Sequence, residues 1–365
     1  MLQDLVQQLR ISDRFTLRHP RSGARSLPAP FRQRLQQQPA SVQALCLTMY
    51  LRDYLYENYF LRGPAEHSAD DLEALSDDSA IEPNGAIEAF RDRLDRSNSG
   101  QGYWQAGWTV LGQRSDGFIA VRRDGITLDV HPQQELPVGL RKLKVNQKIS
   151  IKLPHNRIEP GAYIAIGDCG PVESPSPGSR LISSSTSQSA ELKRQSNQQL
   201  NLYFNLQARA AAQLMERITQ ALNGVAIAFD LAMPNHPKAY NRPDSAILSI
   251  YCRDWPQIAA LVQPIAQQLH EEQSLRKATL PLTQPWLPGV SLAEEPSRAA
   301  SARENFGLHR CYAIAQGLLK ADTLGQGNDQ AARLAHIQTA FEQWNIRWDL
   351  PHLNIGSEML EARPH

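Results

Sequence analysis

The chain has 365 residues, of which 41% are hydrophobic and 21% charged, a composition typical of a folded protein with a sizeable core. Lys and Arg number 38 against 37 Asp and Glu, so the net charge of +1 disfavours a general nucleic-acid-binding protein. No apolar run approaches the ~20 residues that a membrane span needs, and the N-terminus lacks the apolar core of a signal peptide. We therefore expect a cytoplasmic protein of about two domains.

Residues 1–96 are predicted to form a helical N-terminal region. Apolar side chains recur at helix spacing through residues 42–63, and the Gly63–Pro64 pair ends that pattern. Between residues 63 and 90 the chain carries eight acidic residues and no Lys or Arg. Such a run is typical of a solvated face or an exposed loop.

Residues 97–170 are predicted to form a small antiparallel β subdomain. The segments FIAVRR and ITLDVH alternate in character on either side of Asp124–Gly125, which is a strong hairpin signal. Two further strand patterns, KISIKLP and GAYIAIGDCG, follow at regular spacing, as in a small barrel or curled sheet. Residues 171–197 are rich in Pro and Ser, which predicts a linker or exposed loop.

Residues 198–365 are predicted to form a mixed α/β C-terminal domain. Strand patterns occur at 200–206, in VAIAFDLAM and at 246–253, and helix patterns occur at 208–223, 255–272, 304–321 and 331–344. The overall expectation is an α+β protein with a helical N-terminal part, a small β subdomain and this C-terminal domain.

The standard motifs of several enzyme classes are absent from the sequence. There is no phosphate-binding loop, no dinucleotide fingerprint, no HExxH zinc motif and no GxSxG nucleophile motif. The four cysteines are far apart and form no CxxC pair, and no two His have metal-ligand spacing on a helix. The sequence therefore predicts no cofactor and no metal site.

The segment MPNHPKAYNRPDSAIL (233–248) is denser in polar side chains than a connecting loop requires. Lys and Arg side chains suit a phosphate group, and His or Tyr can move a proton. The alternative is a solvated loop in which Arg and Asp pair only locally. The candidate residues are His236, Lys238, Tyr240, Arg242 and Asp244.

A second candidate segment is RENFGLHRCYAIAQGLL (303–319). Asn305 is predicted to cap the helix that follows, which places His309 and Arg310 in its first turns, where the positive helix end favours an anion. Tyr203 and Asn205, on the strand LNLYFNL, are candidates to line the same cavity. The alternative is an ordinary capped amphipathic helix with its apolar side chains directed inward.

Two tryptophans of the predicted β subdomain also have two interpretations. Trp104 and Trp108 are candidates to stack on a peptide or a base, and the alternative is that they belong to a core.

Six segments in this order resemble the HopA-type effector family, named for a type III secretion effector of plant pathogens. The resemblance runs from about Tyr50 to Asn354. Its landmarks are YLRDYLYENYF, SNSGQGYWQAGW, PGAYIAIGDCG, NLYFNLQARAAAQLMERITQALN, YNRPDSAILSIY and PGVSLAEEPSRAASARENFGLHRCYAIAQGLL.

The resemblance implies one of two functions. The founding effector looks like an interaction protein. Relatives in lanthipeptide-type gene clusters look like metal-independent phospho-Ser/Thr lyases, beside an aminoglycoside-phosphotransferase-like kinase that phosphorylates a precursor peptide. The expected partners are thus that peptide and kinase, with neither nucleic acid nor membrane. The alternative is a non-catalytic peptide- or protein-binding adaptor.

For a lyase, the candidate residues take distinct roles. Relatives often carry a Lys after the Phe-containing strand, where this chain has Leu231 and Ala232. If that Lys is catalytic, either this chain is inactive as a lyase or Lys238 is the substitute. The candidate proton-moving residues are Lys238, His236 and His309, the phosphate-binding residues are Arg242 and Arg310, and the peptide-binding residues are Tyr203, Asn205, Tyr240 and Asp244.

Overall fold

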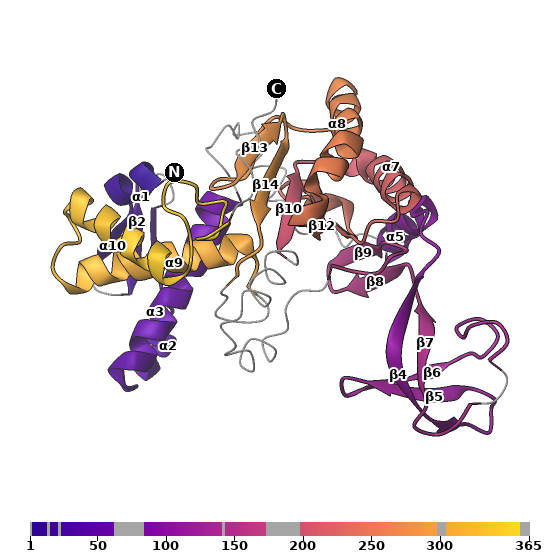
Figure 1. Ribbon diagram of the computed structural model, residues 1–365. Coiled ribbons are helices and arrows are strands. Elements are labelled where there is room, and N and C mark those ends of the chain that lie inside the picture. The colour runs from indigo at the N-terminus through magenta and orange to yellow at the C-terminus, as the bar shows by residue number, and fades with distance from the viewer. Residues whose placement is uncertain are drawn as a thin grey trace.

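The structure is a computed structural model, and Figure 1 shows the course of the chain. Only residues 171 and 172 of the predicted linker 171–197 are described, and much of the acidic run 63–90 lies outside the described residues. The structure describes residues 2–12, 15–20, 23–61, 84–140, 143–172, 198–297 and 304–357.

A seven-stranded sheet forms the centre of the fold, and every strand pairing described in it is antiparallel. Along β10 the apolar residues alternate, so Leu200, Leu202 and Phe204 are directed to one face and are fully buried. The strands are, in spatial order, β13 (Gln284–Leu287), β14 (Val290–Glu294), β10 (Gln199–Phe204), β12 (Ala246–Tyr251), β11 (Asp230–Pro234), β9 (Ala162–Ile166) and β8 (Asn156–Glu159).

Three helices cover that apolar face. They are α5 (Asn84–Ser97), α7 (Ala211–Gly224) and α8 (Trp255–Glu271). The predicted helix 208–223 becomes a short 3₁₀ turn, η2 (Ala208–Ala210), followed by α7, whose residues Leu214, Ile218 and Leu222 are all fully buried. A second 3₁₀ turn, η4 (Cys252–Asp254), leads into α8.

A second lobe combines helices from the N-terminal and the C-terminal parts of the chain (Figure 1). Its helices are α1 (Leu2–Gln8), α2 (Ala29–Gln36), α3 (Ala40–Leu55), the π-helix η1 (Tyr56–Phe60), α9 (Phe306–Thr323) and α10 (Gln330–Gln343). Gly317 allows α9 and α10 to approach closely, because a Cβ there would lie 2.5 Å from the Ile337 Cα. The predicted inward residues of α9, Phe306, Cys311 and Ile314, are buried.

The prediction of a wholly helical N-terminal region missed a three-stranded sheet. It consists of β1 (Arg10–Ser12), β2 (Thr16–His19) and β3 (Gly23–Ser26). These strands have three or four residues and contain Arg, Ser and His, so they lack the alternation and β-branched content by which strands are recognised.

Four strands form a separate β subdomain that projects from the body of the protein in Figure 1. In spatial order they are β6 (Ile126–Val130), β5 (Ile119–Arg123), β4 (Tyr103–Gln113) and β7 (Lys148–Leu153). The predicted hairpin is confirmed, with positive φ at Asp124 (49°) and Gly125 (81°). A core of its own, which includes Val121 and Ile151, holds the subdomain together. The strand GAYIAIGDCG instead joins the central sheet as β9, because it pairs with β11.

The α+β fold class is therefore confirmed. None of the described helices has the length and apolar character needed to cross a membrane.

Candidate functional site

The second face of the central sheet carries a row of polar side chains. Asp230, Ser249 and Asn201 are direct cross-strand neighbours on β11, β12 and β10, so their side chains share one face. The Ser249 hydroxyl donates to Asn201 Oδ1 at 2.8 Å, and Asn201 Nδ2 donates to Glu295 Oε2 at 2.6 Å. Tyr203, two residues along β10, lies on the same face. We call Asp230, Ser249, Asn201 and Tyr203 the polar face.

Asp230 is the titratable group of the polar face that the sequence analysis did not select. Its Oδ2 accepts the Val172 N–H at 3.1 Å, and its buried Oδ1 has no hydrogen-bond partner among the described residues. Burial raises the pKa of Asp230 to about 6, although the Val172 hydrogen bond opposes the change. A carboxyl group with such a pKa can accept a proton near neutral pH. The available signal was one charged residue inside the apolar pattern VAIAFDLAM.

Arg242 is held in place by a buried carboxylate. Arg242 Nε donates to Asp244 Oδ1, and Nη2 donates to Asp244 Oδ2 at 2.6 Å. The Asp244 side chain is only 5% exposed, whereas the Arg242 side chain is 38% exposed. Nη2 also donates to the Tyr56 hydroxyl at 3.5 Å, which receives a second hydrogen bond from Asn305 Nδ2 at 3.3 Å. Burial lowers the pKa of Arg242, but Asp244 raises it more, so the net direction is upward.

His309 and Arg310 lie inside the second lobe. Both are 0% exposed. Arg310 Nε donates to the Pro351 carbonyl at 3.0 Å, Nη1 lies 2.9 Å from His309 Nδ1, and the guanidinium stacks over Phe306 at 4.5 Å. Burial lowers the pKa of Arg310 to about 10, and the charge of Glu295 opposes this. The side chains therefore turn inward from the helix, and their predicted roles in catalysis and phosphate binding stay predictions.

The remaining candidates have local contacts. His236 Nδ1 accepts the Lys238 N–H at 3.0 Å and so caps the 3₁₀ turn η3 (Pro237–Tyr240), on which Lys238 is exposed. The buried Tyr240 hydroxyl donates to the Pro234 carbonyl at 3.0 Å. Asn205 Nδ2 donates to the Ala278 carbonyl at 2.9 Å. Tyr240 and Asn205 thus fix the backbone around the polar face.

Tyr203 connects the two predicted segments. Its ring lies 6.2 Å from that of Phe306 at the start of α9. Burial raises the pKa of its hydroxyl well above the usual value, and Glu295 and Asp244 raise it further. The predicted cap is also confirmed, since Asn305 Oδ1 accepts the Leu308 N–H at 2.9 Å. The structure thus brings Tyr203, Asp244 and the start of α9 together at one end of the polar face.

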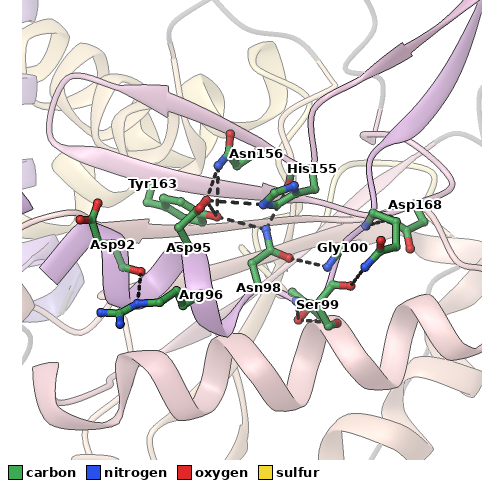
Figure 2. Close-up of polar contacts among 12 residues, drawn as sticks. Asp92, Asp95, Arg96, Asn98, Ser99, Gly100, His155, Asn156, Tyr163 and Asp168 are labelled. Carbon is green, nitrogen blue, oxygen red and sulfur yellow. Dashed lines mark hydrogen bonds and ion pairs between the residues drawn. The ribbon is translucent and has the colours of Figure 1, made fainter. Parts of the chain in front are cut away.

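The motif SNSGQG forms a different polar cluster, shown in Figure 2, where α5 meets β8 and β9. The buried Tyr163 hydroxyl donates to Asp95 Oδ1 at 2.8 Å, and Asn98 Nδ2 donates to the Tyr163 oxygen at 3.2 Å. Asn98 Oδ1 accepts the Gly100 N–H at 3.0 Å. A Cβ on Gly100 would lie 2.9 Å from the His155 Cβ. This cluster fixes the point at which the chain leaves the body for the β subdomain.

Within the part of the chain that the structure describes, no three His, Cys, Asp or Glu residues are grouped so as to hold a metal ion. Of the two predicted stacking residues, Trp108 is buried at 4% exposure, and Trp104 is 51% exposed.

Comparison with known proteins identifies the family. The model of the HopA1 effector protein family matches residues 153–353, more than half of the chain. An effector protein from Pseudomonas syringae pv. tomato strain DC3000 has a structure with 14% identity and a TM-score of 0.38, covering 86% of this chain and 99% of that chain. An effector protein from P. syringae pv. syringae strain 61 gives 13% identity and a TM-score of 0.40, covering 87% and 99%. No curated protein matches in sequence. The chain belongs to the HopA1 effector protein family.

Proposed function

We propose that the chain is a lyase that eliminates phosphate from phospho-Ser or phospho-Thr of a precursor peptide, in the maturation of a lanthipeptide-like natural product. The observation that supports this proposal is the position of Arg242. Its side chain is 38% exposed, and its guanidinium is fixed by the buried Asp244 beside the end of the polar face. The resemblance to family members in lanthipeptide-type gene clusters supports the same reaction class.

The reaction requires three groups in contact with the peptide. A base removes the α-proton, a second group stabilises the negative charge that develops on the adjacent carbonyl, and an acid or cation assists the departure of phosphate. As the Cα–H bond breaks, the Cα=Cβ double bond forms and the Cβ–O bond breaks, so that inorganic phosphate leaves. Arg242 Nε and Nη2 face Asp244, which leaves Nη1 to donate to a phosphate oxygen. Because Asp244 already orients the guanidinium, little ordering accompanies phosphate binding.

The peptide backbone would lie along the polar face. The candidate proton acceptors are Lys238 and His236, which lie in the same loop as Arg242, whereas the third candidate, His309, is fully buried. An aminoglycoside-phosphotransferase-like kinase is the proposed partner that supplies the phosphopeptide.

The test uses the full chain with phosphothreonine and phosphoserine peptides, and with its own precursor after phosphorylation. Mass spectrometry follows the products, and an added thiol traps the alkene. Loss of phosphoric acid with thiol addition is the expected result. Arg242→Ala is expected to lower kcat/KM about 100-fold, and Arg242→Lys to restore little because a bidentate pair with Asp244 is lost.

The matched control is Arg347→Ala, since Arg347 also pairs with an aspartate two residues along the chain, Asp349 Oδ2 at 2.7 Å. This control is expected to keep full activity. Loss of phosphate that leaves the hydroxyl group would mean hydrolysis and would contradict the proposal. An intact, phosphorylated native precursor after prolonged incubation would favour the alternative, a non-catalytic peptide-binding adaptor.

A further inference from the structure

The β subdomain lies outside the part of the chain that the family model covers. That match begins at residue 153, the last residue of β7, whereas β4, β5 and β6 all precede it. The strands have a core of their own and project from the body (Figure 1). The subdomain therefore has a surface that neither the polar face nor the family match explains.

The outer face of the subdomain carries a basic row. Arg122 is the cross-strand partner of both Thr127 and Thr109, and Thr109 is the partner of Lys148, so the four side chains share one face. Their sequence neighbours Trp108, Val110, Val121 and Ile149 are directed to the opposite face and form the core. Arg122 and Lys148 are exposed, and neither makes an ion pair with the described residues.

This row borders a shallow hollow of about 440 Å³. Gly107, which has no side chain, and the small Thr109 line it, and a Cβ on Gly107 would meet nothing within 4 Å. Arg123 reaches the hollow from the hairpin, where it donates to the Ala106 carbonyl at 3.1 Å and pairs with Asp124. Three cations and one carboxylate line the hollow, so it favours an anion.

An exposed aromatic side chain lies on the same face. Trp104 is 51% exposed and is the cross-strand partner of Lys152. Lys152 and Lys148 are four residues apart on β7, so they share a face and are separated by roughly 13 Å. That distance matches an extended peptide of about four residues, with an apolar residue on Trp104 and carboxylates at Lys148 and Arg122.

We propose that this basic hollow and Trp104 bind an acidic peptide segment in an extended conformation. Arg forms bidentate hydrogen bonds with carboxylates, and the indole supplies apolar contact area. Sequence-tolerant binding of single-stranded nucleic acid uses a series of stacking aromatic side chains. None of the described residues that line the hollow is aromatic, so Trp104 is the stacking side chain beside it. The chemistry of the surface thus favours carboxylates on a peptide over phosphates on a nucleic acid, and it does not depend on the lyase reaction.

The test is a binding titration of the full chain, followed by fluorescence anisotropy. The probe is a labelled ten-residue peptide of Glu, Asp and Leu, compared with a Lys-rich peptide of equal length and with a single-stranded oligothymidylate of equal charge. We expect the acidic peptide to bind at least 10-fold more tightly than either. Arg122→Ala combined with Lys148→Ala is expected to weaken that binding at least 10-fold, and Trp104→Ala about 5-fold.

The matched control is Arg114→Ala, because Arg114 is in the same subdomain but pairs with Asp129 at 2.6 Å. It removes one positive charge and is expected to change the affinity by less than 2-fold. Equal or tighter binding of the oligothymidylate would overturn the proposal in favour of a nucleic-acid surface. Equal affinity of the Lys-rich peptide, or unchanged binding by a double variant whose circular dichroism matches the wild type, would also overturn it.

Discussion

Replacing Asp230 by Asn is expected to change how the stability of the protein depends on pH. The two side chains have nearly the same shape, and Asn can still accept the Val172 N–H. Asp230 has a pKa of about 6 in the folded protein against an ordinary value of 3.8, because burial penalises its charged form. The folded state therefore holds a proton on Asp230 that the unfolded state releases between these two pH values.

The sign and size of the effect follow from this difference. As pH rises from about 4 to about 6, the unfolded state gains stability by ionising Asp230 while the folded state does not, so the free energy of unfolding falls. The separation between 3.8 and about 6 corresponds to ~3 kcal/mol in total. Between pH 4.5 and 7.5 the expected change is about 2 kcal/mol. Asp230→Asn removes this contribution.

The assay is urea unfolding of both proteins at several pH values, followed by tryptophan fluorescence. The stability of Asp230→Asn relative to the wild type should rise by about 2 kcal/mol from pH 4.5 to 7.5. All other titrating groups cancel in that comparison. Asp116→Asn, an exposed aspartate of the β subdomain, controls for loss of one negative charge. Parallel curves for Asp230→Asn and the wild type would refute the reasoning that burial raises this pKa.

Three further predictions concern a helix cap, a close helix contact and the reactivity of two cysteines. Asn305→Ala removes the cap of α9 and should lower the free energy of unfolding, measured by urea titration, by ~1 kcal/mol. An unchanged free energy of unfolding would contradict the capping role. Gly317→Ala places a Cβ 2.5 Å from the Ile337 backbone and should destabilise the protein by about 1–3 kcal/mol, measured as a lower melting temperature. Iodoacetamide should modify the exposed Cys169 and spare the buried Cys311, whose thiol pKa is raised by burial. Peptide mapping of the folded protein checks this.

The structural elements that could be predicted from the sequence are those whose conformation depends on a few residues close together in the chain. The Asp124–Gly125 turn imposes its hairpin because both positions need positive φ. The cap by Asn305 follows from one side chain and one nearby N–H group. The small sheet of β1 to β3 was missed because its strands are short and polar and depend on the lobe that packs around them. Which sheet β9 joins is likewise decided by its partner β11, which lies 64 residues further along the chain.

The sequence indicated some of the residues of the candidate site, but it did not indicate which of them lie side by side in the fold. The sequence identified Arg242 and Asp244 as a pair, and the structure places that pair beside Tyr56, which is 186 residues away from Arg242. It did not identify Asp230, Ser249 and Asn201 as a row, because their alignment depends on the register of three strands. A single polar residue in an apolar strand indicates a special role, but its neighbours become known only when the strands are paired.

The contrast between Arg242 and Arg310 shows why position decides what such a residue can do. Both were predicted to bind phosphate, Arg242 from its residue type in a polar loop and Arg310 from its place in the first turns of a helix. Arg310 is 0% exposed, and its guanidinium already contacts His309, Phe306 and a backbone carbonyl. Its Nη2 has no hydrogen-bond partner among the described residues, yet burial encloses the whole side chain, and removing it would leave the Pro351 carbonyl without its donor. Arg242 is oriented by a buried group, Asp244, yet keeps part of its side chain exposed. Of the two, Arg242 is therefore the arginine whose side chain is accessible at the surface of the described structure.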